Sequence, residues 1–527
     1  MLYFCITGIY AQEKKTAWDN TNDKNWPTGF IKKEIQSTID GTIQKAWFYP
    51  SQLAKPQPLI VSLHTWSGDY NQEDPLTKEV LIRDWNYIHP DFRGANNRPE
   101  AGVSELVISD IEDAIQFAIK NGNVDLTNIH IIGVSGGGLA TLVCYMKLKY
   151  PVKSFNAWAS ISDLESWYQE CKVRGLKYAN DIEMITTNGK GFDASEARKR
   201  SPLLMDFHPE LRKGSFLNIY AGIHDGYTGS VPISQSMKFF NRILDEIMPS
   251  QLSKKISDSM IQSLVINQIN SNPDTLLTLG GRNVHLIREV PGLCFTLFEG
   301  THEMIVPQAL ALIPIDGEKN RMRLNVLTIG DSNAAAEFGY PYQLSKLLPN
   351  STIINKSISG NTIGFDNLDQ PKLNTLTNIN RYLEEAYSDL GKDKELDYIL
   401  IGLGTNDTKR IFIDRQKEVP QNLSRLMEMV KGYFTEHNRK MPAICIVSPP
   451  PMDGQKANVE KYGGSTDRIL KNNLKFKKVA DKNHVGFLNV YEPLLNGFPD
   501  KTLDGVHLNE KAQFEMAKLI AKYLVTR

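Results

Sequence analysis

Residues 129–140 read IHIIGVSGGGLA, an apolar run that ends in a glycine-flanked serine and continues into further apolar sequence. The run Ile129–Val134 has the length and composition of a buried parallel strand, and Leu139 and Leu142 follow at helical spacing. The sequence therefore predicts a strand, a tight turn and a helix, with Ser135 on the turn. Small glycines beside the serine let the backbone turn sharply, so the Ser135 hydroxyl is exposed as a candidate nucleophile.

Two residues further along the first half complete a trio with this serine. Asp225 and His302 each stand just past a predicted strand, and they follow Ser135 in the order serine, aspartate, histidine. A serine nucleophile needs an imidazole as base and a carboxylate that orients the imidazole. We therefore expect these three residues to perform acyl transfer. Asp163 is the alternative carboxylate, and His224 is read as an orienting neighbour of Asp225.

The first half alternates strands with helices from about Lys32 onward. A helix is expected after Ser104, its N-cap, and ends near Asn121. Strands are predicted at Ile43–Tyr49, Pro58–Leu63, Trp85–Phe92, Ile129–Val134, Phe155–Ile161, Phe216–Ala221 and Cys294–Phe298. This alternation predicts an α/β sheet wound on both sides. The polar, irregular stretch at about 163–214 suggests a lid or insertion, and a second insertion is expected at about 249–281.

These motifs resemble those of the α/β-hydrolase superfamily, in its esterase and prolyl-oligopeptidase-like branch, over residues 25–313. The resemblance implies that Ser135 attacks the substrate and that His302 serves first as general base and then as general acid. It also implies that Asp225 fixes the tautomer of His302.

The same resemblance implies an oxyanion hole made of two backbone N–H groups. One belongs to Gly136, and the other comes from the loop at residues 64–67, with Trp66 as the expected donor. The family usually has glycine after the histidine of this loop, whereas this chain has Thr65. His64 is expected to order the loop and not to act as a base.

The second half restarts the strand–helix alternation after a short charged break at residues 316–321. Residues 324–332 read LNVLTIGDS, a predicted strand aimed at Ser332, and further buried strands are expected at Tyr398–Leu403 and Ala443–Val447. A closing amphipathic helix is predicted by the spacing of Phe514, Ala517, Ile520, Ala521 and Leu524.

Four separated blocks of this half resemble the SGNH, or GDSL, hydrolases over residues 323–527. The blocks are Gly330-Asp331-Ser332, Gly360, Gly404-Thr405-Asn406-Asp407 and Asp504-Gly505-Val506-His507. The resemblance implies a flavodoxin-like, three-layer α/β/α fold. It also implies that Ser332 is the nucleophile, that His507 is the base and that Asp504 orients it.

The spacing of these residues suits that chemistry. Asp504 and His507 are three residues apart, so a single turn can bring the carboxylate to the imidazole. The Ser332 N–H, the Gly360 N–H and the Asn406 side-chain amide are the expected donors to the oxyanion. Glycine is needed where the backbone approaches the substrate closely. Asp331 is expected to order the loop and not to react.

Five aromatic residues are candidate sugar platforms or, equally, core residues. They are Trp167 and Tyr168 in the predicted lid, and Tyr340, Tyr342 and Phe365 in the second half, which contains no tryptophan.

The 527 residues are too many for one ordinary domain. We expect an α/β-hydrolase domain at 25–313, a linker at 314–322 and an SGNH domain at 323–527. Residues 1–12, MLYFCITGIYAQ, resemble the end of a secretory signal without its basic start, with a buried terminal strand as the alternative. Export to the bacterial periplasm or medium is therefore expected.

Composition excludes several other classes. Lys plus Arg equals Asp plus Glu at 60 each, so no net charge favours nucleic acid. No apolar stretch reaches the length of a membrane span. The five cysteines are scattered without metal-ligand spacing, which argues against a disulfide scaffold or zinc site, although a Cys144–Cys171 pair stays open. No metal or organic cofactor is implied.

Two ester-cleaving constellations in one exported chain suggest a polymer with more than one ester decoration. The leading hypothesis is a bifunctional serine carbohydrate esterase that removes acetyl, or larger acyl, groups from plant or algal polysaccharide. One alternative is a single active SGNH acetylesterase beside a catalytically silent or glycan-binding first domain. Others are a prolyl-oligopeptidase-like peptidase in the first domain and lipase or thioesterase action in the second.

Overall fold

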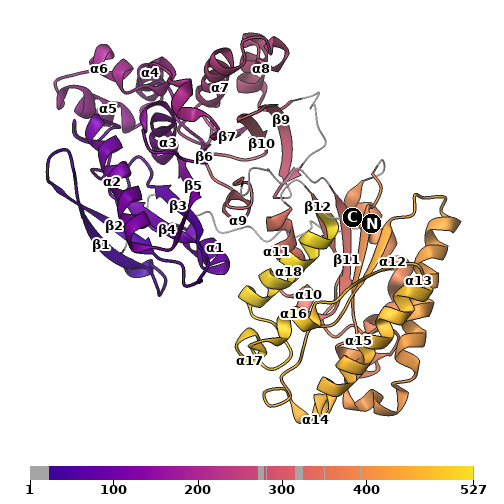
Figure 1. Cartoon of the computed structure of the whole chain (residues 1–527). Helices are drawn as coiled ribbons and strands as arrows, with labels where there is room; N and C mark the ends of the chain where they lie inside the picture. Colours follow the sequence, from indigo (N-terminus) through magenta and orange to yellow (C-terminus); the bar gives the residue numbers. More distant parts are fainter. Residues whose placement is uncertain are drawn as a thin grey trace, which may run out of the picture. The chain divides into compact units, whose positions relative to one another are not determined.

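The computed structural model describes residues 23–270, 278–280, 282–314, 324–348, 351–391 and 394–525. These residues fall into two compact units, one formed chiefly by residues 23–270 and 284–306 and the other chiefly by residues 324–525 (Figure 1). The predicted signal remnant at 1–12, with Cys5, lies outside the described residues, and so does the predicted linker after residue 314.

The first half of the chain forms a ten-stranded sheet of order β1-β2-β4-β3-β5-β6-β7-β10-β9-β8. Its strands are β1 (Ile31–Gln36), β2 (Ile43–Tyr49), β3 (Gln57–Leu63), β4 (Asn86–Pro90), β5 (Val124–Val134), β6 (Ser154–Trp158), β7 (Phe216–Gly222), β8 (Thr278–Leu279), β9 (Arg282–Val290) and β10 (Leu293–Phe298). The six strands from β4 to β10 in sheet order are mutually parallel, and the outer strands pair antiparallel. The carboxyl ends of β5, β7 and β10 therefore meet at one edge of the sheet.

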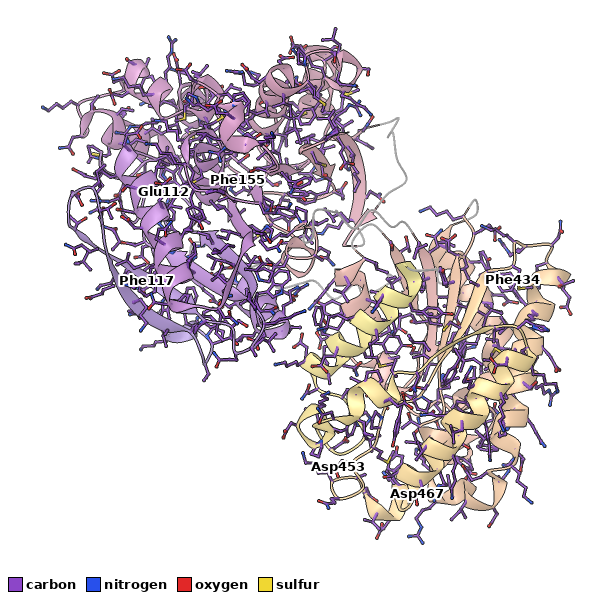
Figure 2. The ribbon with its side chains drawn as sticks, in the orientation of Figure 1. Glu112, Phe117, Phe155, Phe434, Asp453 and Asp467 are labelled. Carbon is purple, nitrogen blue, oxygen red and sulfur yellow. The ribbon has the colours of Figure 1, made fainter. Side chains whose placement is uncertain are left out.

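Most helices of this half pack on the sheet or on neighbouring helices. The helices are α1 (Leu76–Arg83), α2 (Glu105–Asn121), α3 (Gly136–Lys147), α4 (Leu164–Arg174), α5 (Tyr178–Thr187), α6 (Ala194–Lys199), α7 (Ser234–Ile247) and α8 (Asp258–Asn267). The short helix α9 (Val306–Ala309) follows β10 along the chain. Helix α3 packs on β5 and β6, where the ring of Phe155 lies edge-on to that of Tyr145 at 5.3 Å (Figure 2). Helix α2 packs on β4 and β1, and its Phe117 ring meets the Phe48 ring of β2 at 5.5 Å.

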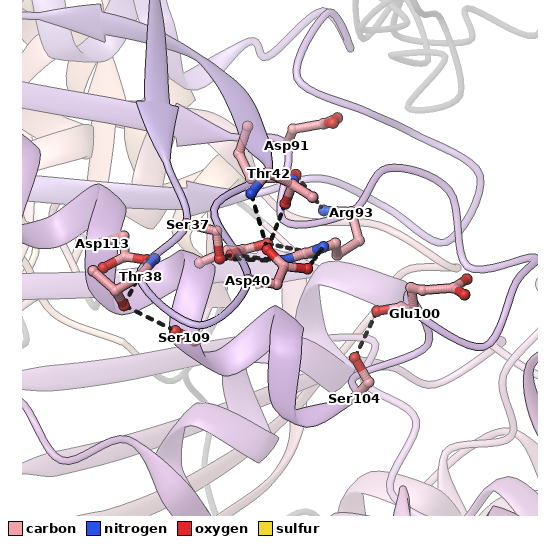
Figure 3. Close-up of polar contacts among 12 residues, drawn as sticks. Ser37, Thr38, Asp40, Thr42, Asp91, Arg93, Glu100, Ser104, Ser109 and Asp113 are labelled. Carbon is pink, nitrogen blue, oxygen red and sulfur yellow. Dashed lines mark hydrogen bonds and ion pairs between the residues drawn. The ribbon is translucent and has the colours of Figure 1, made fainter.

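A buried ion-pair network fixes the loop that follows β4 (Figure 3). The Arg93 guanidinium donates to the carboxylate of Asp110 on α2 at 2.5 Å and to that of Asp40 in the β1–β2 turn at 2.8 Å. It also donates to the Ser37 hydroxyl at 3.1 Å. Because Arg93 has a positive φ of 79°, these contacts hold a backbone conformation that side chains disfavour.

The predicted elements of this half are mostly present, with two differences. Strand β2 has the predicted bounds, and α2 begins directly after Ser104, whose hydroxyl donates to the Glu100 carbonyl at 2.6 Å and makes no side-chain cap (Figure 3). The second difference is that the stretch at 163–214, where the sequence suggests a lid or insertion and no element is predicted, contains helices α4, α5 and α6. Buried residues spaced three apart on α5, among them Ala179, Ile182 and Ile185, account for the helix there.

The second unit contains a five-stranded, entirely parallel sheet of order β12-β11-β13-β14-β15. Its strands are β11 (Asn325–Gly330), β12 (Thr352–Asn355), β13 (Tyr398–Gly402), β14 (Ala443–Val447) and β15 (Gly486–Leu488). In chain order this is 2-1-3-4-5, the arrangement of flavodoxin-like folds. Such sheets bind ligands where the strand order reverses, which here is the carboxyl edge between β11 and β13.

Alternate residues of these strands feed two separate cores. Leu327 and Ile329 of β11 pack with α12 and α13, which carries Phe434 (Figure 2), whereas Val326 packs with α11 and α18. The helices are α10 (Ser332–Ala335), α11 (Tyr340–Leu347), α12 (Thr375–Leu390), α13 (Glu418–Glu436), α14 (Val459–Tyr462), α15 (Ser465–Lys482), α16 (Tyr491–Leu495), α17 (Phe498–Lys501) and α18 (Glu510–Val525). A sheet with a core on each face confirms the predicted three-layer α/β/α fold. The predicted class of two α/β domains is likewise confirmed.

The four cysteines among the described residues, Cys144, Cys171, Cys294 and Cys445, are buried and form no disulfide, so the pairing of Cys144 with Cys171 is not formed. None of the described helices combines the length and the apolar character needed to cross a bilayer.

Candidate active sites

Ser135 stands on a strained turn between β5 and α3. Its φ of 60° and ψ of −117° lie outside the regions that side chains favour. Its N–H donates to the Trp158 carbonyl at 3.0 Å, which holds the turn to the neighbouring strand β6. A Cβ atom at Gly133 would lie 2.3 Å from the Gly137 carbonyl oxygen, so the turn requires glycine there. The structure thus has the strand–turn–helix geometry that a serine nucleophile uses.

His302 and Asp225 form the acid–base pair of the first unit. The His302 Nδ1 lies 2.7 Å from Asp225 Oδ2, and Asp225 Oδ1 accepts from the N–H groups of Gly226 and Val231. Asp163, the alternative acid, instead caps α4 by accepting from the Ser166 N–H at 3.1 Å. The geometry therefore favours Asp225 as the carboxylate that orients the imidazole.

All three residues of the first trio follow strands that end at the same sheet edge. Ser135 follows β5, Asp225 follows β7 and His302 follows β10. No hydrogen bond joins the Ser135 hydroxyl to the His302 ring among the described residues. Contacts between nucleophile and base commonly tighten only when substrate binds.

The backbone N–H groups of Gly136 and Trp66 lie in adjoining segments. A Cβ atom at Gly136 would lie 2.3 Å from the Trp66 nitrogen, so the two backbones are in contact. The Thr65 N–H donates to Gln72 Oε1 at 2.9 Å and is therefore occupied. No described residue accepts a hydrogen bond from the Trp66 N–H. The Thr65 N–H is therefore not free to bind an oxyanion. Within the described part of the chain the Trp66 N–H is free and lies beside Gly136, where the second oxyanion donor is expected.

The two other histidines of this region have structural partners. His64 is buried, stacks on Phe92 at 3.8 Å and contacts the Asp91 carbonyl through Nε2 at 2.7 Å, as a loop-ordering residue would. His224 contacts Glu299 Oε1 at 2.6 Å and not Asp225. Its pKa is raised, first by its hydrogen bond to Gln268 and then by Glu299.

The second trio is fully joined. The His507 Nε2 lies 2.8 Å from Ser332 Oγ, and its Nδ1 lies 2.7 Å from Asp504 Oδ2. Asp504 Oδ1 also accepts from the N–H groups of His507 and Val506. Burial works to raise the pKa of Asp504, but these hydrogen bonds outweigh it and lower the pKa. The carboxylate therefore stays ionised and fixes the Nδ1 proton, which leaves Nε2 to accept the serine proton.

The expected oxyanion donors stand beside this trio. Ser332 follows β11 and Asn406 follows β13, at the edge where the strand order reverses. Gly360 has a φ of +90°, which glycine adopts without strain, and its carbonyl accepts from Asn367 Nδ2 at 2.6 Å. Asn406 Nδ2 donates to the Asn361 carbonyl at 3.0 Å. Its second amide N–H has no acceptor among the described residues.

Two acidic residues order this region. Asp331 is buried and caps α10 by accepting from the Asn333 N–H at 3.0 Å, in keeping with a loop-ordering part. Both oxygens of Asp407 accept from the Ile363 N–H, which holds the segment that follows Gly360. Burial, with the nearby charge of Asp331, raises the pKa of Asp407 to about 7. Asp407 lies in one of the predicted motif blocks, but the sequence indicates no role for it.

Three supporting residues escaped the sequence reasoning. Tyr462 donates its hydroxyl to Asn406 Oδ1 at 3.4 Å, Asp181 accepts from Trp66 Nε1 at 3.0 Å, and Glu299 joins His224 to His285. Each acts through a partner that is distant in the sequence, so no local pattern indicates it.

The candidate sugar platforms are mostly core residues. Trp167, Tyr168, Tyr340 and Phe365 are buried, whereas Tyr342 is 38% exposed. Among the described residues, no cluster of three His, Cys, Asp or Glu side chains is placed to hold a metal ion.

Comparison with known families assigns each half separately. Residues 83–252 match the model of the Prolyl oligopeptidase family, and residues 327–513 match that of the GDSL-like Lipase/Acylhydrolase family. The first match includes Ser135 and Asp225, and the second includes Ser332, Asp504 and His507. These matches confirm the two predicted family resemblances and support serine hydrolase activity.

Several solved structures are similar to parts of the chain, and three of them illustrate the range. A carbohydrate acetylesterase from Sinorhizobium meliloti is 22% identical, with 38% of this chain and 99% of that chain covered and a TM-score of 0.33. An aryl esterase from M. smegmatis is 19% identical, with 38% and 99% covered and a TM-score of 0.32. An acylaminoacyl peptidase from Pyrococcus horikoshii is 20% identical, with 42% and 36% covered and a TM-score of 0.34. A search of curated proteins gave no match.

Proposed function

We propose that this chain, which joins a prolyl-oligopeptidase-family hydrolase domain to a GDSL-like one, is a bifunctional serine carbohydrate esterase. It removes acetyl groups, or larger acyl groups, from plant or algal polysaccharides at two independent sites. The observation that carries the proposal is the joined trio of the second unit, with Ser332, His507 and Asp504 linked at 2.8 and 2.7 Å. That arrangement suits acyl transfer from an ester to water.

At the second site, Ser332 Oγ attacks the acyl carbonyl and passes its proton to His507 Nε2. The negative oxygen that forms is stabilised by the Ser332 and Gly360 N–H groups and by the Asn406 amide. His507 then gives the proton to the departing sugar oxygen, which leaves an acyl-serine. Water, deprotonated by His507, releases the acid and regenerates Ser332, while Asp504 stabilises the imidazolium in both halves.

The first site follows the same scheme with Ser135, His302 and Asp225. Its oxyanion donors are the N–H groups of Gly136 and Trp66. The carboxylate contact at 2.7 Å and the strained serine turn support this assignment. Substrate binding would bring the Ser135 hydroxyl and the His302 ring into hydrogen-bond contact.

The polysaccharide substrate is inferred from the pairing of two ester-cleaving sites. A polymer that carries several ester groups is a substrate for both sites. SGNH domains resembling this one often act on acetylated carbohydrate. We place the protein in the periplasm or the medium, because residues 1–12 resemble the end of a secretory signal. Tyr342, 38% exposed on α11, is the most exposed of the five candidate aromatic platforms.

Two rival functions each have one observation in their favour. A silent or glycan-binding first domain is favoured because no Ser135–His302 hydrogen bond is formed among the described residues. A peptidase activity in the first domain is favoured by the family model matched at residues 83–252.

Activity measurements on serine variants separate these functions. Hydrolysis of an aryl acetate and acetate release from acetylated xylan and pectin are measured for Ser135→Ala, Ser332→Ala and the double variant. Two active esterase sites predict partial loss in each single variant and background rates in the double variant. Wild-type rates in Ser135→Ala on every ester favour a silent first domain, and cleavage of a prolyl peptide that depends on Ser135 favours a peptidase. Absence of acetate release from both glycans, with the aryl acetate still cleaved, contradicts the carbohydrate substrate.

A further inference from the structure

The stretch predicted as a lid holds two loops of the first site at once. Helices α4 and α5 contact the loop at residues 64–67, which we call the oxyanion loop, and the segment at residues 225–231, which we call the acid loop. The contacts are hydrogen bonds that involve side chains of the helices and of the oxyanion loop.

Helix α5 holds the oxyanion loop. Asp181 Oδ2 accepts from the Trp66 indole Nε1 at 3.0 Å, and Lys177 Nζ donates to the Ser67 hydroxyl at 2.8 Å. Trp66 is only 2% exposed, so its indole is fixed by packing as well as by this hydrogen bond. The partners are 115 residues apart in the sequence, so the contact exists only once the insertion has folded.

Helix α4 holds the acid loop. Trp167 Nε1 donates to the Ser230 carbonyl at 2.9 Å, and Arg174 donates to the Gly229 carbonyl at 2.7 Å. Gly229 lies directly against the acid–base pair, because a Cβ atom there would be 2.2 Å from Asp225 Oδ1 and 2.5 Å from the His302 Cβ. A shift of this segment would therefore move the pair.

Aromatic side chains join the two helices to each other and to Trp66. The Trp66 ring lies edge-on to the Trp167 ring at 4.9 Å, and Trp167 stacks on Tyr178 of α5 at 5.1 Å. The Tyr168 hydroxyl of α4 donates to Glu183 of α5 at 2.7 Å. Helices α4 and α5 thus pack together and contact both the oxyanion loop and the acid loop.

Two of the three polar groups of Trp66, its carbonyl and its indole N–H, are hydrogen-bonded. Its carbonyl accepts from the Asn96 N–H at 2.9 Å, in the loop anchored by the Arg93 network (Figure 3), and its indole N–H is held by Asp181. Its main-chain N–H has no acceptor among the described residues and lies in the segment that touches Gly136. A residue held from two sides with one free donor is suited to bind a charge that develops only during the reaction.

We propose that α4 and α5 form a brace that positions the first site, in which Asp181 is the positioning residue for the Trp66 N–H. This proposal rests on the proposed function of that site. The brace holds the oxyanion donor through α5 and the acid–base pair through α4, so the two keep their spacing. Loss of the Asp181 contact lowers kcat and leaves KM nearly unchanged, because the donor acts on the transition state and not on substrate binding.

The test uses the full chain with Ser332→Ala, so that only the first site acts, and follows aryl acetate hydrolysis. Asp181→Ala is expected to lower kcat by about 10- to 100-fold, the cost of a small misplacement of a catalytic group. Asp181→Asn, which keeps an acceptor for the indole N–H, is expected to stay within about threefold of the parent. Trp66→Phe, which keeps an aromatic ring but removes the indole N–H, is expected to match Asp181→Ala.

The double variant Trp66→Phe/Asp181→Ala decides whether the two residues act through one contact. Its loss is expected to equal that of the worse single variant, since each change removes the same hydrogen bond. Glu165→Ala, which removes an ion pair of α4 with Arg198 that touches neither loop, serves as the matched control and should keep the parent kcat. If Asp181→Ala fails to fold, Trp66→Phe and Asp181→Asn carry the test.

Separate outcomes overturn separate claims. Parental kcat in Asp181→Ala, or losses that multiply in the double variant, overturns the brace while leaving the site's function intact. A loss confined to KM does the same. If Ser135→Ala in the Ser332→Ala chain changes nothing, the proposed function of the first site is wrong, and the brace falls with it.

Discussion

The two sites assemble the same three residue types from very different lengths of chain. In the second unit the acid and the base are three residues apart, and one turn joins them through a backbone and a side-chain contact. In the first unit Asp225 and His302 are 77 residues apart and meet because β7 and β10 are neighbours in the sheet. The local pair needs little from the rest of the fold, whereas the distant pair depends on it.

This difference extends to the state of the nucleophile. Ser332 already contacts His507, while the first unit has its acid–base pair formed and its serine held on a strained turn. The first site also relies on an added helical body, α4 and α5, to hold its loops. We infer that changes remote from the chemistry weaken the first site more than the second.

The largest expected effect is loss of the joined trio. In a Ser135→Ala chain, which isolates the second site, His507→Ala should lower kcat roughly a millionfold, because base and nucleophile act as a unit. Ser332→Ala should lower it as much, and the double variant no further. Burst and steady-state hydrolysis of an aryl acetate measure this. Additive losses would show that the two residues act independently and would contradict the trio.

The next effect separates the two carboxylates of the first unit. In a Ser332→Ala chain, Asp225→Asn should lower kcat about 10⁴-fold, because the amide no longer fixes the required His302 tautomer. Asp163→Asn should change kcat less than about twofold, since asparagine caps a helix as well as aspartate does. Steady-state rates on an ester decide between them, with thermal unfolding as the control for folding. A larger loss at Asp163 would reverse the assignment.

A smaller effect concerns the oxyanion donors of the second site. In the Ser135→Ala chain, Asn406→Ala should lower kcat about 10²- to 10³-fold, the usual cost of one such donor. Tyr462→Phe removes only the hydroxyl that contacts Asn406 Oδ1 and should cost about threefold to tenfold. Tyr387→Phe, which removes a tyrosine hydroxyl contact with Glu395 in the same unit, is the control. Equal losses in Tyr462→Phe and Asn406→Ala would mean that Tyr462 is itself a donor to substrate.

Much of the fold was predictable because its signals are local. The glycines around Ser135 and the apolar run before it indicate the turn directly, and the Asp504–His507 spacing indicates the second acid–base pair. The helices of 163–214 were missed because their buried positions, such as Ile182 and Ile185, are sparse among polar residues. Those positions nevertheless recur at helical spacing, so a count over the whole stretch would have found α5.

The supporting residues could not be predicted for a different reason. Asp181 and Tyr462 act on partners 115 and 56 residues away, and such contacts follow from the packing of whole elements. The choice between Asp225 and Asp163 also depended on the sheet, since both follow strands. What the sequence supplied was the residue types and their order, and the fold supplied the pairing.

The last expected effect is on stability and not on rate, and it arises from Asp407 in the second unit. Burial raises the pKa of Asp407 to about 7 from its usual 3.8, so the folded state keeps a proton that the unfolded state releases. Between about pH 4 and 7 the free energy of unfolding should therefore fall as pH rises, by up to about 1.4 kcal/mol per pH unit, and level off above pH 7. Asp407→Asn should flatten this slope, whereas the exposed Asp467→Asn should leave it unchanged.

The unfolding of the second unit can be followed separately. Every tryptophan lies at or before Trp167, so the transition of the second unit is the one seen by far-ultraviolet circular dichroism but absent from tryptophan fluorescence. If the slope persists in Asp407→Asn, the proton belongs to another buried group. Asp331 is the first candidate, since burial raises its pKa too.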